Sequence, residues 1–172
     1  MDYDWSPTST RPQKLYRVYR PYQHTILSPR GLTASNSTLY LYTNAHYSLF
    51  LQSIANHRNQ VAGVPTPYIS FFSSKEEAES WALAAEDEFL KPAYILEIDV
   101  GHVSMKDTVM WSVQDIMDKS GNELGLGGMR NSEWLVLWQV PEAAISRTFK
   151  SSTDVRVGRF PQFYLKGSGG WY

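Results

Sequence analysis

The stretch Glu133-Trp134-Leu135-Val136-Leu137-Trp138-Gln139-Val140 is almost continuously apolar, and Pro141 follows it directly. A strand whose two faces are both apolar is typical of the inside of a sheet, since one exposed face would bring in alternating polar residues. This stretch therefore predicts a buried central strand that ends at Pro141 and carries a carboxylate at its start.

Short apolar runs predict three more strands, at 15–19, 68–72 and 93–100. In the last of these, Leu96, Ile98 and Val100 share one face. Weaker patterns predict a loop at 20–38, one or two helices within 39–60, a short helix at 107–118 and a glycine-containing loop at 119–130.

The strongest helix signal lies at 75–90. Ser73 or Ser74 can cap its first turn, and Glu76 and Glu77 suit the positive end of the helix dipole. An apolar stripe at helical spacing gives this helix one face to bury: Ala78, Trp81, Ala82, Ala85 and Phe89.

Length and composition favour one soluble domain. The chain has 172 residues, a net charge of −1 and no cysteine. A core of useful size fits this length. The near-neutral charge argues against a nucleic-acid partner, because it gives no electrostatic field to attract one. Without cysteine, disulfides and thiolate chemistry are excluded. With no signal peptide and no apolar run long enough for a membrane span, we expect no membrane partner and a cytoplasmic protein.

The domain boundaries follow from local composition. Residues 1–13 are polar with two prolines and predict a flexible leader, while the glycine-rich end, 166–172, predicts a flexible tail. A single domain is expected over 14–165. Strands together with helices predict an α+β fold with a split mixed or antiparallel sheet, a cleft and helices packed against it.

In three of the predicted strands, one polar residue interrupts or begins an otherwise apolar run. These are Arg17, Ser70 and Glu133. Buried polar groups usually meet one another, a ligand or water, because burial without a partner is costly. If strands 15–19 and 68–72 are neighbours with the Arg17 and Ser70 faces toward one cleft, the two side chains converge, and Glu133 completes the group.

An Arg, a Ser and a Glu in this chain order match the signature of the ADP-ribosyltransferases, and the layout resembles their cholera-toxin-like branch. Leu15-Tyr16-Arg17 is similar to the opening strand of that family, and Ser28-Pro29-Arg30-Gly31-Leu32 to the loop after it. Tyr68-Ile69-Ser70 and Glu133 resemble the serine strand and the catalytic glutamate. The similar layout covers about 130 residues. It also resembles uncharacterised fungal domains with a Pro-Tyr/Phe-Ile-Ser stretch.

The resemblance implies an ADP-ribosyltransferase-like fold with an NAD cleft, and a toxin-like or effector enzyme that cleaves the nicotinamide–ribose bond of NAD. Glu133 would be catalytic and would stabilise the ribosyl cation, as carboxylates do in glycoside hydrolysis. Arg17 would anchor NAD through its planar fork of donors, and Ser70 would hold the site together. Phe72 and Tyr16 would supply aromatic walls for the cofactor.

Two departures from the family pattern bear on the reaction. The family has Ser-Thr-Ser where this chain has Ser70-Phe71-Phe72, and it has Glu or Gln where this chain has Asn131. Asn131, with Arg130 and the 119–130 loop, would choose the acceptor. Arginine modification is therefore disfavoured, and the expected acceptor is another protein group or water. These two acceptors correspond to an ADP-ribosyltransferase and an NAD glycohydrolase.

Each polar residue also has a plainer interpretation. Arg17 would lie on an edge strand or pair with Asp99, Ser70 would be an ordinary strand serine, and Glu133 would face solvent. The alternative function is then a catalytically inactive protein-interaction module of the same fold. An RNA 2′-phosphotransferase shares the fold and cofactor, but it needs a basic surface that the net charge does not support.

No metal site is expected. His46 and His57 are 11 residues apart, which on one helix is about 16 Å, and the other two histidines, His24 and His102, have no partner at ligand spacing. Gly125-Leu126-Gly127-Gly128 matches neither a Walker loop nor a dinucleotide fingerprint. We interpret it as part of a flexible loop.

Overall fold

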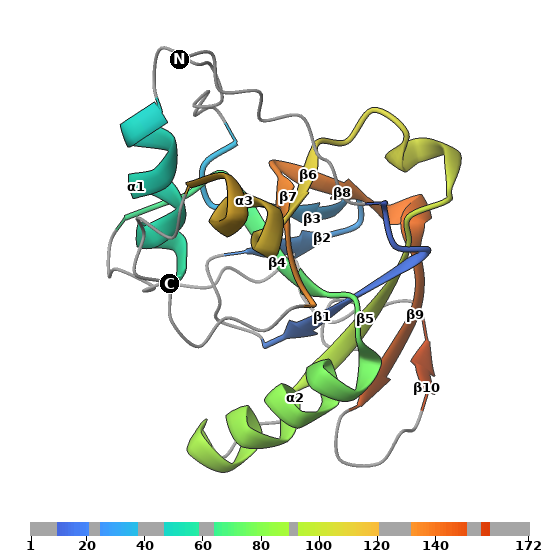
Figure 1. The fold of residues 1–172 in the computed structure, drawn as a ribbon. Helices are drawn as coiled ribbons and strands as arrows, with labels where there is room; N and C mark the ends of the chain where they lie inside the picture. The colour runs from blue at the N-terminus through green and yellow to red at the C-terminus, as the bar shows by residue number, and fades with distance from the viewer. Residues whose placement is uncertain are drawn as a thin grey trace.

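The structure is a computed structural model, and it describes residues 10–20, 25–37, 47–58, 64–89, 93–120, 132–150 and 156–158. Within these ranges the chain has an α+β fold with two antiparallel sheets and three α-helices (Figure 1). The α+β class is therefore confirmed. Every pairing among the described strands is antiparallel. Of the two predicted sheet types, mixed and antiparallel, the described strands therefore form the antiparallel one.

The larger sheet has seven strands in the order β10-β9-β5-β1-β4-β7-β6. Their bounds are β1 Lys14–Tyr19, β4 Tyr68–Phe72, β5 Tyr94–Asp99, β6 Met110–Ser112, β7 Glu133–Leu137, β9 Ile145–Lys150 and β10 Arg156–Gly158. The smaller sheet has the order β2-β3-β8, with bounds Ile26–Ser28, Gly31–Thr33 and Gln139–Pro141. The helices are α1 Tyr47–Arg58, α2 Lys75–Phe89 and α3 Val113–Ser120, with short 3₁₀ turns at Val103–Met105 and Glu142–Ala144.

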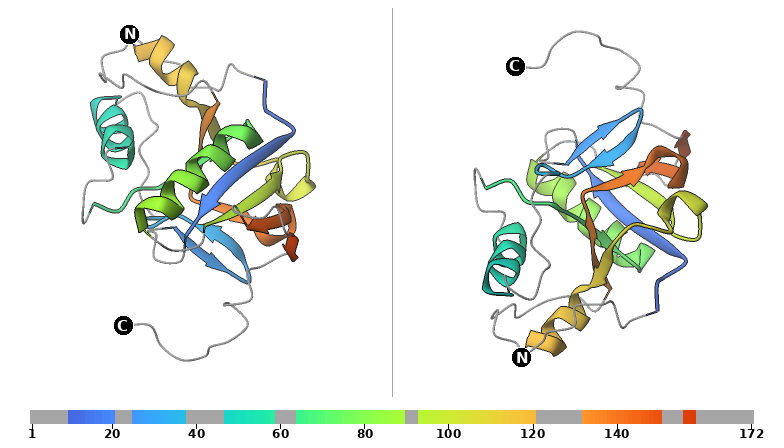
Figure 2. Two further views of the ribbon diagram at one scale, coloured as in Figure 1. Left: turned by 90° about the horizontal axis from the view of Figure 1, so that it is seen from below. Right: turned by 90° about the horizontal axis from the view of Figure 1, so that it is seen from above.

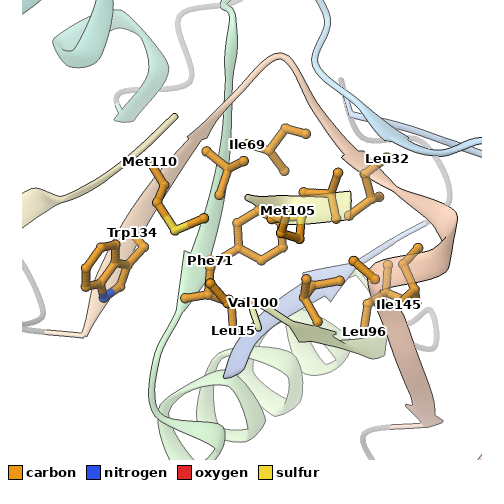
Figure 3. Packing of buried hydrophobic residues seen from close by; sticks show 14 of the residues in the cluster. Leu15, Leu32, Ile69, Phe71, Leu96, Val100, Met105, Met110, Trp134 and Ile145 are labelled. Carbon is orange, nitrogen blue, oxygen red and sulfur yellow. The ribbon is translucent and has the colours of Figure 1, made fainter. Parts of the chain in front are cut away.

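The main hydrophobic core lies between the two sheets. Leu15, Phe71 and Trp134 reach into it from the large sheet, while Leu32 reaches into it from the small one (Figure 3). Met105 of the first 3₁₀ turn fills the same cluster. Because these side chains leave almost no surface exposed, the cluster fixes the small sheet on one face of the large sheet.

The helices cover the other face of the large sheet. Tyr68 at the start of β4 packs in a cluster with α1 and α3, and Phe72 at its end packs against the cluster formed with α2. These two residues share a face of β4, since side chains alternate along a strand. In Figure 2 the view from below has α2 in front, and the view from above has the small sheet in front.

The predicted helix at 75–90 is confirmed as α2. Ser74 caps it, because its Oγ accepts a hydrogen bond from the backbone N–H of Glu77 at 3.2 Å. Ser74 and Glu77 stand at the spacing of a capping box, with a serine cap and a glutamate three residues later. Ala78 and Ala82 of the predicted stripe are fully buried against the sheet.

Other predicted boundaries need correction. The 20–38 segment was expected to be a loop, but it contains β2 and β3, which are only three residues long and carry little periodic signal. The short helix expected at 107–118 begins later, as α3, because β6 comes first. Within 39–60, residues 47–58 form one helix, and 39–46 lie outside the described residues.

The apolar stretch from Glu133 to Val140 is not one strand, as the sequence predicts, but two. It divides at Trp138 into β7 of the large sheet and β8 of the small one. Trp138 has φ 63°, in the left-handed region that side-chain-bearing residues seldom adopt. Its N–H donates to the Pro67 carbonyl and its own carbonyl accepts from Ala34, both at 2.7 Å. The apolar run thus supplies two sheets, joined by one bend.

Two residues of the predicted leader contact the rest of the described chain. Arg11 Nη2 donates to the Thr108 carbonyl at 3.0 Å, and the Gln13 carbonyl accepts from the Val100 N–H at 3.0 Å. These contacts attach part of the predicted leader to the domain, while 1–9 and the expected tail at 166–172 lie outside the described residues. None of the described helices has the length and apolar character to cross a membrane.

Candidate functional site

The three strands that carry the predicted site residues lie side by side in the large sheet. β4 lies between β1 and β7, and so Ser70 lies between the strands of Arg17 and Glu133. Phe72 pairs with Glu133 across β4 and β7, and Ser70 pairs with Leu135. Glu133 is therefore diagonal to Ser70 on adjacent strands, a relation that brings side chains of one face within about 7–8 Å.

The hypothesis that Arg17 and Ser70 face one cleft is wrong, because their strands are neighbours but the two side chains lie on opposite faces of the sheet. Tyr16, not Arg17, pairs with Phe72, so Tyr16 and Phe72 lie on the helix-covered face with Ser70. Arg17 falls on the opposite face, toward the core between the sheets, where its guanidinium lies 6.0 Å from the Phe71 ring. A register shift of one residue is enough to reverse a face in this way.

Arg17 is buried and makes well-formed hydrogen bonds. Nη1 donates to the Ser70 carbonyl and Nη2 to the Thr25 hydroxyl, each at 2.7 Å. Only 9% of the residue is exposed, and this burial lowers its pKa to about 10. The plainer interpretation that Arg17 occupies an edge strand or pairs with Asp99 is also wrong, because β1 lies between β5 and β4 and Asp99 is opposite Lys14.

Ser70 is hydrogen-bonded to His57, a histidine for which the sequence alone predicts no part in the site. Nε2 of His57 lies 2.7 Å from Ser70 Oγ, and Nδ1 lies 2.6 Å from Thr66 Oγ1. The ring is edge-on to Tyr68, with centroids 5.7 Å apart. His57 is in the last turn of α1, so this helix delivers an imidazole to the face of β4 that carries the Ser70 hydroxyl.

Glu133 of β7 has a cationic neighbour, Arg58, at the end of α1. Oε2 of Glu133 lies 3.7 Å from Nη2 of Arg58, the residue after His57. The Glu133 side chain is 13% exposed and that of Arg58 is 21% exposed, so the pair is largely but not fully withdrawn from solvent. The interpretation of Glu133 as a solvent-facing strand end is therefore wrong.

The first residues of β7 are fastened to α2. The hydroxyl of Ser132 donates to Oε2 of Glu77 at 2.5 Å, and the Ser132 carbonyl accepts from the backbone N–H of Ser73 at 2.8 Å. Since Ser132 directly precedes Glu133, these bonds hold the backbone that carries the candidate carboxylate. Glu77 also belongs to the cap of α2, so one residue joins the helix start to the site.

Aromatic side chains lie near this carboxylate. Phe72, opposite Glu133 in the register, stacks on Trp81 of α2 with centroids 6.2 Å apart. Trp81 is 45% exposed, which is high for a residue of that size. Tyr16 packs partly buried against the same α2 cluster. The predicted aromatic walls, Phe72 and Tyr16, thus stand on the Glu133 face.

Two predicted acceptor residues, Asn131 and Arg130, lie outside the described residues, as does most of the 119–130 loop. Among the residues that are described, no group of three His, Asp or Glu side chains is placed to hold a metal ion. His57 and Arg58 were the functional candidates that sequence reasoning missed. Nothing local in the sequence marks them, because their partners are 13 and 75 positions away.

The described side chains bring together a carboxylate, a guanidinium, an imidazole and a hydroxyl on one face of the sheet. Such a group suits a reaction that develops positive charge near the carboxylate, with the guanidinium available for an anionic part of the substrate. It contains a Ser–His contact, but the third group on the imidazole is the neutral hydroxyl of Thr66 rather than a carboxylate.

Comparisons with known proteins give a family without an assigned activity. The family described as "Domain of unknown function (DUF7587)" matches residues 10–154. A solved structure named EcPltA is similar over 81% of this chain and 75% of its own, with 14% sequence identity and a TM-score of 0.47. No match was found among the curated proteins.

Proposed function

This chain belongs to the DUF7587 family, and we propose that it cleaves the nicotinamide–ribose bond of NAD, as an ADP-ribosyltransferase or an NAD glycohydrolase. The proposal starts from the Arg-Ser-Glu order that resembles the ADP-ribosyltransferases. The observation that carries it is the diagonal placement of Ser70 and Glu133 on one face of adjacent strands.

Glu133 lies on a fixed part of the backbone, as a carboxylate that stabilises a ribosyl cation should. Breaking the bond leaves positive charge on the ribose, and a fixed carboxylate stabilises that charge. The bonds from Ser132 to Glu77 and Ser73 fix the strand start that carries Glu133. In our proposal the bond between nicotinamide and the ribose carbon breaks, and neutral nicotinamide leaves with the bonding electrons. Water or an acceptor nucleophile then forms a bond to that carbon and loses its proton to solvent water.

Ser70 and Arg17 have supporting parts in this proposal. His57 fixes the Ser70 hydroxyl through a 2.7 Å contact, so the hydroxyl is already oriented on the Glu133 face. Arg17 donates to the Ser70 carbonyl from the other face and thereby holds β4. That Arg17 also contacts NAD stays a prediction, and so does the part of Phe72 and Tyr16 in cofactor binding.

In this proposal, the residues that recognise the acceptor lie outside the part of the chain that the structure describes. Asn131 and Arg130 precede Glu133 closely, and we retain them as the acceptor-recognition pair. Because the family pattern has Glu or Gln at the position of Asn131, we favour water or a non-arginine protein group as acceptor. NAD is thus both cofactor and substrate in this proposal.

The test is nicotinamide release from NAD by the purified full chain, with Glu133→Gln in parallel. The matched control is Asp107→Asn, which removes one carboxylate charge from a side chain that is 88% exposed. We expect release by wild type and by the control, and a loss of about a hundredfold or more in Glu133→Gln, which is typical when a charge-stabilising group is removed. Thermal unfolding of all three proteins checks that the fold is kept.

A second candidate function, an inactive interaction module, is favoured by one observation. Both terminal nitrogens of Arg17 are used inside the protein, where an active enzyme of the resembled family would be expected to offer them to NAD. This candidate predicts no nicotinamide release and no NAD binding. NAD binding without release would instead indicate a transferase that requires its acceptor.

A further inference from the structure

We infer that Arg58 is the anion-binding residue of this site and that it receives the diphosphate of a nucleotide ligand. The inference deepens the proposed function, on which the choice of NAD as the ligand rests. Neither the Arg-Ser-Glu pattern nor the family match assigns a part to Arg58, which lies at the C-terminal end of α1.

The first step is the face on which Arg58 lies. Its guanidinium is 3.7 Å from the Glu133 carboxylate, and its neighbour His57 contacts Ser70 Oγ. Arg58 therefore lies on the same face of the sheet as the candidate carboxylate and hydroxyl. Arg17 projects to the opposite face, where it donates to the Ser70 carbonyl and lies beside the Phe71 ring.

The second step is how far each guanidinium is engaged. Arg17 donates through both terminal nitrogens at 2.7 Å, in a buried environment. Arg58 has a longer contact with Glu133, beyond hydrogen-bond distance, and its Nη1 has no hydrogen-bond partner among the described residues although the atom is buried. A buried donor in that condition is costly, so a ligand that accepts from it gains affinity.

The third step is the ligand chemistry that fits. A guanidinium presents donors in a planar fork that matches two oxygens of a phosphate, and its charge does not depend on pH in the working range. A diphosphate beside Glu133 would otherwise face a like charge. Arg58 lies next to the carboxylate and can place positive charge between the two anions, which reduces their repulsion.

The ion pair with Glu133 also gives Arg58 a role in orienting the carboxylate. Paired with Glu133 at 3.7 Å, it keeps the carboxylate beside a cation on the sheet face. The contact is loose, so the guanidinium can turn its fork toward phosphate oxygens without a large loss of ion-pair energy. In this proposal the same residue orients the Glu133 carboxylate and binds the anion.

The experiment is calorimetric binding of inorganic pyrophosphate and of NAD to wild type, Arg58→Gln and Lys106→Gln. Lys106→Gln is the matched control, since it also removes one positive charge. The Lys106 side chain is 69% exposed, and the residue is distant in sequence from Arg58. We expect Arg58→Gln to weaken both ligands about tenfold or more, the size of one or two charge-assisted hydrogen bonds. Lys106→Gln should stay within about twofold of wild type.

Each outcome has a distinct meaning. Unchanged NAD and pyrophosphate affinity in Arg58→Gln would overturn the part of Arg58 and leave the proposed function standing. Binding of pyrophosphate but not NAD to wild type, lost in Arg58→Gln, would support the anion site and overturn the NAD proposal. If wild type binds neither ligand, both are overturned.

A second variant protects the test against a folding defect. Arg58→Lys keeps the charge beside Glu133 but lacks the planar fork. We expect it to unfold at the wild-type temperature and still to bind pyrophosphate several-fold more weakly. Wild-type affinity in a folded Arg58→Lys would limit the role of Arg58 to charge alone and contradict the fork-based recognition.

Discussion

Ser70 Oγ lies 2.7 Å from Nε2 of His57, although one residue belongs to β4 and the other to the end of α1. The other ring nitrogen of His57 contacts the Thr66 hydroxyl at 2.6 Å. The imidazole therefore bridges two hydroxyl groups of the segment that leads into and through β4, and it joins the helix to the sheet where the candidate site is formed.

This bridge predicts coupling between the two residues in stability. We expect His57→Ala and Ser70→Ala each to lower the free energy of unfolding by roughly 1–2 kcal/mol, because each leaves a partly buried polar group without its partner. The loss of unfolding free energy in the double variant should be about 1 kcal/mol smaller than the sum of the losses in the two single variants. Urea unfolding of the four proteins measures the cycle. Strict additivity would show that the contact contributes nothing in solution.

A second prediction concerns the buried carboxylate of Glu97, away from the candidate site. Lys14 Nζ lies 2.7 Å and Ser146 Oγ 2.9 Å from the same carboxylate oxygen. Burial alone would raise the pKa of Glu97, but these hydrogen bonds and the charges of Lys14 and Arg147 outweigh it and lower the pKa overall. A lowered pKa in the folded state stabilises the protein above the unfolded value, at about pH 4 and higher.

That contribution is lost as the pH falls through the lowered pKa of Glu97. We expect Glu97→Gln to be less stable than wild type by roughly 1–2 kcal/mol at pH 7, and the difference to shrink toward pH 3. Urea unfolding of both proteins at several pH values checks this. A difference that stays constant over the whole range would mean that the ionised form has no special stabilisation.

The strands of the site were predictable, but the faces were not. The segments around Arg17, Ser70 and Glu133 are apolar runs of strand length, and apolar content is a local property of the sequence. The pairing of Tyr16 with Phe72 depends on register, which local sequence does not determine. Arg17 was therefore assigned to the Ser70 face, whereas its side chain lies on the other.

The partners of the site were harder still to predict. His57 and Arg58 reach Ser70 and Glu133 only because α1 ends over β4 and β7, a tertiary relation between segments far apart in sequence. The small strands β2 and β3 gave no periodic signal, since three residues are too few to show alternation. Their position in the fold depends on packing of residues such as Leu32 in the core.

Gly31 gives a third prediction, because no side chain fits at this position. Its φ is +109°, and an added Cβ would overlap the Val140 carbonyl oxygen and lie 2.6 Å from the backbone nitrogen of Glu142. We expect Gly31→Ala to lower the free energy of unfolding by more than about 3 kcal/mol, because backbone strain and a backbone clash act together.

Gly101→Ala is the matched control for that change. The nearest atom to an added Cβ there is an Asp99 carboxylate oxygen at 3.3 Å, on a side chain that can move. We expect a loss of less than about 1 kcal/mol for this variant. Thermal or urea unfolding compares the two. Equal effects would mean that the close approach of β3 to β8 is not rigid in solution.

The last prediction concerns the bend at Trp138, where one apolar run passes from the large sheet to the small one. The left-handed φ of 63° costs a residue with a Cβ about 1–2 kcal/mol, but not a glycine. Trp138→Ala and Trp138→Gly both remove the indole that packs against the α1 cluster, so their difference isolates the backbone. We expect the Gly variant to be the more stable of the two by about 1 kcal/mol.

The neighbouring exposed residue Gln139 supplies the control for this comparison, since it lies in β8 with an ordinary strand conformation. There the order should reverse, with Gln139→Ala more stable than Gln139→Gly by about 0.5–1 kcal/mol, because glycine loses more conformational entropy on folding. Urea unfolding of the four variants measures both differences. If alanine is favoured at both positions, Trp138 does not hold the left-handed bend in solution, and the transfer of the chain between the sheets must occur in another way.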